Sequence, residues 1–210
     1  MKRYVLFAVL VAAIIVVVLV STLAGGRPQL GAPSSPAPAP VTINAPPAEI
    51  KAFVISVLND KTRSVPTPFE QMSVHPFGDP GFPPDYQIAA ASKQDPALEA
   101  YARLSAADRA NDLFLFDPLV KSWDSEYQVN GRALPFHCNF ILHLAPAGNG
   151  ATELSVLEYQ PQVNRGSHFT VFGKEGPGTY DDVVAVPPTN KERSALLDFI
   201  ASEWKKSRGR

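Results

Sequence analysis

Apolar residues dominate the first 24 positions of the chain. No polar residue interrupts residues 5–20, and Ser21 and Thr22 are the only polar residues in the stretch that continues to Ala24. As a helix that rises about 1.5 Å per residue, residues 4–24 would span roughly 31 Å, which matches the hydrocarbon thickness of a bilayer. The pattern therefore predicts one transmembrane anchor within residues 1–24.

The orientation of this anchor follows from Lys2 and Arg3, which stand directly before the apolar run. The positive-inside bias keeps such an N-terminus in the cytoplasm and puts the rest of the chain outside it. A cleaved signal peptide is the alternative, because Ala24 ends a passable small-residue cleavage site. The apolar run exceeds the roughly 7–15 residues of a signal peptide, which favours an uncleaved anchor. We expect a single-pass cell-membrane protein that contacts the bilayer through residues 4–24.

Residues 25–40 contain mainly Pro, Ala, Gly and Ser, and Pro alternates with Ala toward the end of the segment. Such a composition favours an extended polyproline II conformation and offers little apolar surface for packing. We therefore expect a Pro/Ala-rich linker at 25–40, which holds an extracytoplasmic domain at 41–210.

Helical periodicity returns after a short strand predicted at 41–43. Apolar residues then recur with helical spacing at Ile50, Phe53, Val54, Val57 and Leu58. Residues 61–95 contain six prolines, so an irregular excursion with no helix longer than a turn is expected there. Asp95 and Pro96 predict the start of a helix that ends near residue 103, and Ser105 with Asp108 could cap another short one.

Strand patterns follow at residues 113–116, 125–130, 133–144, 152–159, 168–172 and 182–186. Asn130-Gly131 is a strong signal for a tight hairpin between the second and third of these strands. In residues 133–144, apolar side chains alternate with a set that includes His137, Asn139 and His143. The alternation predicts one face in the core and a second, more polar face.

The last predicted element is an amphipathic helix after Thr189 and Glu192, which have the spacing of a capping box. Its apolar stripe consists of Leu196, Phe199, Ile200 and Trp204. Because a run of strands lies between helices at both ends, the fold class is α+β, with a largely antiparallel sheet and a C-terminal helix packed on it.

Composition limits the possible partners. From residue 41 onward the chain has 16 basic and 20 acidic residues, a net charge of −4, so we expect no nucleic-acid partner. Cys138 is the only cysteine, so an internal disulfide is impossible, and no cysteine follows the apolar run to carry a lipid. Roughly 170 residues suit one domain with its own core.

Residues 41–50 resemble the opening of the START-like, or helix-grip, superfamily, in which a first strand leads through an Ala-Pro turn into a short amphipathic helix. Residues 136–163 are similar to the central strands of that superfamily, and the closing helix stands in the corresponding place. The resemblance covers about residues 41–206. It implies a curved antiparallel sheet that grips the C-terminal helix, with an apolar cavity between them for a lipid or hydrophobic metabolite.

Candidate chemistry is sparse. His137 and His143 lie six residues apart in one predicted strand, a separation of about 20 Å, so they cannot bind one metal ion together. Glu158 lies within an apolar strand, where it could bind a polar ligand head or act as a base with a raised pKa; an ion pair with Arg165 or Arg132 is the simpler alternative. Cys138 is expected to be a small core residue. We take His137, His143 and Glu158 as candidate ligand-binding residues and expect no catalytic residue, metal or cofactor.

Three functions remain open at this point. The first is a membrane-anchored module that binds a hydrophobic or lipid-like ligand. The second is a structural or interaction protein of the envelope without a small-molecule ligand, which would use a sheet edge or residues 61–95. The third is an enzyme that uses the same cavity. The enzyme ranks last, because no two candidate residues form a recognisable acid–base pair.

Overall fold

The structure is a computed structural model that describes residues 38–66, 69–92, 95–117, 123–129, 132–173 and 176–209. The predicted anchor at 1–24 and most of the linker lie outside these residues. Within the described part, no helix combines the length and the hydrophobicity that are needed to cross a membrane.

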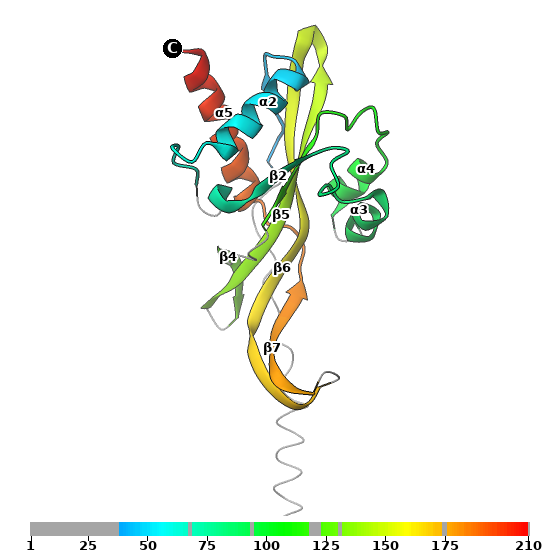
Figure 1. Ribbon diagram of the computed structural model, residues 1–210, viewed down its shortest axis with the longest axis vertical. Helices are drawn as coiled ribbons and strands as arrows, with labels where there is room; N and C mark the ends of the chain where they lie inside the picture. The colour runs from blue at the N-terminus through cyan, green and yellow to red at the C-terminus, as the bar shows by residue number, and fades with distance from the viewer. Residues whose placement is uncertain are drawn as a thin grey trace, which may run out of the picture.

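A seven-stranded antiparallel sheet forms the centre of the fold (Figure 1). The main path runs in the order β1-β6-β5-β3-β2, while β4 pairs with β5 and β7 pairs with β6. The strands are β1 (Val41–Ile43), β2 (Ser73–Pro76), β3 (Leu113–Phe116), β4 (Trp123–Val129), β5 (Arg132–Ala147), β6 (Ala151–Gly173) and β7 (Gly176–Ala185). With the helices below, this arrangement confirms the predicted α+β class.

The long hairpin of β5 and β6 runs along most of the molecule, and the β6–β7 hairpin continues beyond the helices (Figure 1). Residues 152–159 and 168–172, predicted as two strands, are both parts of β6. The strand is irregular between them, because Gln160 and Gly166 have φ values of 53° and 127°. Such bulges bend a strand without ending it.

Helices cover both faces of the sheet. On one face lie α2 (Pro47–Asn59) and α5 (Lys191–Arg208), and on the other lie α3 (Asp85–Ala91) and α4 (Pro96–Ala102) (Figure 1). The amphipathic helices predicted near 50–58 and after Thr189 are thereby confirmed. In α5, Leu196 and Ile200 are buried against the sheet, while Phe53 of α2 meets Trp204 edge to face at 5.0 Å.

The second, more polar face predicted for residues 133–144 carries His137, Asn139 and His143, but it is buried as well. The side chains that face α3 and α4 are covered as well, with Ile141 fully buried and His137 and Asn139 only 8% and 6% exposed. A second apolar cluster lies on this face and includes Phe82, Ile88, Leu98, Phe114, Leu157 and Tyr159. The alternation did not indicate this burial, because the cover comes from apolar residues of α3 and α4 that are distant in the chain.

The proline-rich stretch at 61–95 is more ordered than predicted. It contains a short 3-10 turn at Phe69–Gln71, the strand β2 and the helix α3, which begins directly after Pro84. The expectation of no helix beyond a turn is therefore wrong, since none of the residues of α3 is a proline and no backbone N–H inside the helix is lost. The helix expected after Ser105 is instead a turn, although the Ser105 Oγ accepts a hydrogen bond from the Asp108 N–H (3.3 Å).

Candidate functional site

The structure separates the three residues predicted to bind a ligand. His143 on β5 faces α4, whereas Glu158 on β6 lies opposite Phe140 and faces the other side of the sheet. His137 lies buried opposite Gln162 and borders none of the pockets described below. His143 and Glu158 therefore have to be considered as parts of two different sites.

His143 borders a pocket of about 420 Å³ at an open edge of β6, which we call the edge pocket. Strand β6 pairs with β1 up to Leu154 and with β7 from Gln162 onward. Between these points β6 pairs with a strand on one side only among the described residues, and α4 and the start of α5 flank the other side. The edge pocket is lined by Pro38, Pro40, Ala97, Ala100, Tyr101, Leu104, His143, Ser155, Val156, Leu157 and Arg193.

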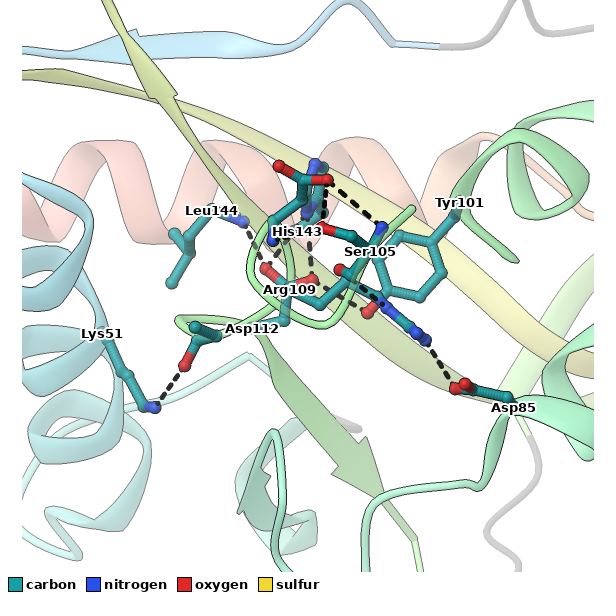
Figure 2. A network of polar contacts seen from close by, with 10 residues as sticks. Lys51, Asp85, Tyr101, Ser105, Arg109, Asp112, His143 and Leu144 are labelled. Carbon is teal, nitrogen blue, oxygen red and sulfur yellow. Dashed lines mark hydrogen bonds and ion pairs between the residues drawn. The ribbon is translucent and has the colours of Figure 1, made fainter. Parts of the chain in front are cut away.

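A buried carboxylate holds His143 in place (Figure 2). Asp112 is fully buried and accepts hydrogen bonds from Tyr101 Oη (2.8 Å) and from the backbone N–H of Leu144 (2.9 Å). His143 Nδ1 lies 3.0 Å from the same carboxylate. The Asp112 carboxylate accepts from Nδ1–H, so Nε2 is an acceptor in the neutral imidazole and a donor in the imidazolium. The arrangement orients the imidazole of His143 at the edge pocket.

Arg109 packs against Tyr101, a member of this network, and links it to Asp85 (Figure 2). Its guanidinium lies over the rings of Phe77 and Tyr101, at 5.1 and 5.7 Å from their centres, and pairs with Asp85 at 2.8 Å. Burial and the neighbouring Asp112 raise the pKa of Tyr101 far above its ordinary value. Tyr101 therefore stays protonated and remains a donor to Asp112.

Glu158 belongs to a second buried network at the start of α5. Its Oε2 accepts a hydrogen bond from the Thr189 N–H (2.9 Å), and its Oε1 lies 3.6 Å from Nε of Arg193, too far for a hydrogen bond. Arg193 also pairs with Asp95, the residue that caps α4. Burial raises the pKa of Glu158 well above its ordinary value, against the opposing effect of Arg193.

The predicted partners of Glu158 are therefore wrong. Arg193 takes the place that Arg165 or Arg132 was expected to fill, and Arg165 pairs with Asp182 at 2.8 Å instead. Glu158 and Asp95 also border a second pocket, of about 350 Å³, beside α3. Glu158 thus contributes to the attachment of α5 and to the wall of a pocket at the same time.

Sequence reasoning missed Asp112, Tyr101 and Arg193. Each acts through partners that are distant in the chain, since Asp112 is 31 residues from His143 and Arg193 is 98 residues from Asp95. The one signal in the sequence for Asp112 is an aspartate directly before an apolar strand. Cys138 is fully buried in the core, as expected for a small core residue, and burial raises the pKa of its thiol.

Within the described residues, no group of three or more His, Cys, Asp and Glu side chains is arranged to hold a metal ion. The chain matches no protein-family model, no curated protein and no solved structure. The case for a function therefore depends on the geometry of the pockets.

Proposed function

We propose that this chain is a membrane-anchored, extracytoplasmic binding module and that its edge pocket holds a small, mostly apolar molecule with a carboxyl or carbonyl head. The observation that supports the proposal most strongly is the lining of this pocket. Ala97, Ala100, Leu104, Val156 and Leu157 supply apolar walls, and His143, Ser155 and Arg193 supply the polar groups. Ligand pockets commonly combine apolar walls with a few polar groups that orient the ligand.

The polar groups of the edge pocket favour an oxygen-rich head. Arg193 is buried and borders this pocket, while its guanidinium also pairs with Asp95 and faces Glu158. A carboxyl or carbonyl oxygen could accept from this guanidinium or from the Ser155 hydroxyl. His143 Nε2 could accept from a protonated carboxyl group when the imidazole is neutral, or donate to a carboxylate when it is protonated.

The edge pocket lies beside the end of the linker, which favours a ligand that comes from the bilayer. Pro38 and Pro40 line the edge pocket and are the last part of the linker. Residues 25–40, extended as polyproline II at about 3.1 Å per residue, would reach roughly 50 Å. The pocket would thus lie within reach of the membrane that the predicted anchor crosses, where amphiphilic carboxylic acids are concentrated.

The proposal is tested with a photoactivatable diazirine fatty acid that is added to the detergent-solubilised full-length protein, with peptide mass spectrometry of the crosslinked sites. We expect crosslinks to α4 and to the part of β6 near Val156. Ala100→Trp fills the pocket and should lower this labelling at least about tenfold, equivalent to about 1.4 kcal/mol of binding. Ala89→Trp is the matched control, because Ala89 is an exposed helical alanine that borders none of the pockets described here.

Crosslinks confined to residues 4–24, or labelling that is equal in Ala100→Trp and the wild type, would contradict the proposal. If one protein partner co-purified stoichiometrically and the fatty acid did not label α4 or β6, the alternative of an envelope interaction protein would be favoured instead.

A further inference from the structure

A third pocket, of about 430 Å³, lies beside α3 and shares no lining residue with the edge pocket. We call it the aromatic pocket, because Phe82, Phe114, Phe116 and Tyr159 form much of its wall. His75 also borders this pocket. The residue belongs to β2, the outermost strand at this end of the sheet.

Ser73, His75 and Asp79 form a continuous hydrogen-bonded array next to the aromatic pocket. Ser73 and His75 are two residues apart in β2, so their side chains point to the same face. Ser73 Oγ lies 2.9 Å from His75 Nε2, and His75 Nδ1 lies 3.1 Å from Asp79 Oδ1. The carbonyl oxygen of Phe116 lies 3.2 Å from Ser73 Oγ and is a second acceptor for the Ser73 hydroxyl.

The chemistry of these groups determines which of them donates. Asp79 accepts from the Gly81 N–H (2.7 Å), and this bond and the one to His75 lower the pKa of the Asp79 carboxyl. The ionised carboxylate accepts from Nδ1–H of His75, which leaves Nε2 as an acceptor, at 2.9 Å from Ser73 Oγ, beside the Phe116 carbonyl at 3.2 Å. The Ser73 hydroxyl donates to Nε2 when it rotates away from that carbonyl. This is the order of roles in a serine nucleophile activated by an oriented histidine.

Gly81 is required for this alignment. A Cβ atom at position 81 would lie 2.2 Å from Nδ1 of His75 and 2.5 Å from Cε1. Any other residue would therefore displace the imidazole from Ser73 and Asp79. The glycine allows the loop after β2 to close against the ring and hold it.

The edge of β2 supplies a donor for a developing negative charge. Phe77 N–H donates to the Asp112 carbonyl on the side of β3 (2.9 Å). Along an antiparallel strand the N–H groups alternate in direction, so the N–H groups of Ser73 and His75 face β3 as well. The N–H of Val74 faces the open side of the sheet. An N–H directly after the nucleophile is a position from which serine hydrolases stabilise the oxyanion.

We propose that Ser73 is the nucleophile of an esterase site, with His75 as general base and Asp79 and Gly81 as positioning residues. The substrate class is carboxylic esters whose acyl or aryl group fits the aromatic pocket. This activity goes beyond ligand binding in the edge pocket and does not depend on it.

The proposed reaction proceeds in two steps. Ser73 Oγ forms a bond to the ester carbonyl carbon while its proton passes to Nε2 and the carbonyl electron pair moves to the oxygen. The intermediate collapses, the carbon–oxygen bond to the alcohol breaks, and the alcohol leaves with the proton from Nε2. Water then attacks the acyl-serine in the same way, which releases the carboxylic acid and restores Ser73.

A fluorophosphonate with a short alkyl chain tests the proposal on the detergent-solubilised full-length protein. We expect one equivalent of label, which peptide mass spectrometry assigns to Ser73, and hydrolysis of p-nitrophenyl butyrate that the label inhibits. Ser73→Ala should abolish both signals. Ser202→Ala is the matched control and should retain both, because Ser202 is an exposed serine of α5 that borders none of the three pockets.

The positioning residues are tested by the kinetics of labelling. Asp79→Asn and Gly81→Ala should lower the maximal rate constant of labelling about 10²-fold, which is within the range for general-base catalysis. The probe concentration that gives half the maximal rate should change little. Circular dichroism and thermal unfolding report whether each variant is folded. Absence of label at Ser73 in the folded wild-type protein, or equal rate constants in folded Asp79→Asn and wild type, would overturn the proposal. Fatty-acid crosslinking in the edge pocket could still be present in either case, so the two proposals fail separately.

Discussion

Asp112 illustrates how a single residue organises the candidate binding site. Its carboxylate is fully buried and serves as acceptor for a side chain from α4, a side chain from β5 and a backbone N–H of β5. The same contacts determine which nitrogen of His143 is available at the edge pocket. Asp112 is therefore expected to support both the stability of the fold and the binding of a ligand head.

Replacement of Asp112 by alanine should destabilise the protein by about 3 kcal/mol or more, because Tyr101 Oη and the Leu144 N–H would lose their acceptor in the interior. Chemical denaturation with urea measures the change in the free energy of unfolding. Asp198→Ala is the control, since Asp198 is exposed on α5 and such a surface substitution should change the free energy of unfolding by about 0.5 kcal/mol at most. A loss for Asp112→Ala that does not exceed that of Asp198→Ala would contradict this role.

At the scale of elements, Glu158 connects β6 to the start of α5. It accepts the backbone N–H of Thr189, just before α5, and lies near Arg193 in its first turn. Arg193 extends the connection to Asp95 at the start of α4. The attachment of two helices thus depends on buried ionisable groups as well as on apolar contacts.

Since burial raises the pKa of Glu158 in the folded state, the folded protein holds this proton at pH values where the unfolded chain has released it. Its contribution to stability is present below the unfolded pKa, near 4.5, and is lost as pH rises above that value. Glu158→Gln keeps an acceptor for Thr189 and cannot ionise. We expect the melting temperature of the wild type, relative to Glu158→Gln, to fall by several degrees between pH 5 and pH 8. A difference between the two proteins that stays constant with pH would contradict this account.

The elements differ in how well the sequence predicts them. Helix α2, helix α5 and strand β5 have strong periodicities and were predicted close to their observed positions. Strand β6 was divided in two because bulges interrupt its pattern, and α3 was missed because prolines surround it. The partners of His143 and Glu158 could not be predicted, since burial and pairing across the sheet depend on the tertiary fold and not on local spacing.

At the scale of the whole molecule, the two faces of the sheet have different roles. The face under α2 and α5 carries the larger apolar core, whereas the three pockets described here border α3, α4 or the loop before α3. The START-like resemblance implied a cavity between the sheet and the C-terminal helix, and it remains a prediction. In our proposal the ligand site lies instead at the edge of β6, where the end of the linker joins the domain.

Native mass spectrometry of the full-length protein, purified from membranes in detergent, tests this account most directly. We predict a mass that retains residues 1–24 and a second species heavier by one small amphiphilic carboxylic acid, which is absent from Ala100→Trp and present in Ala89→Trp. A chain that lacks residues 1–24, or wild-type protein that carries no small molecule when purified from membranes, would contradict the account of a membrane-anchored binding module.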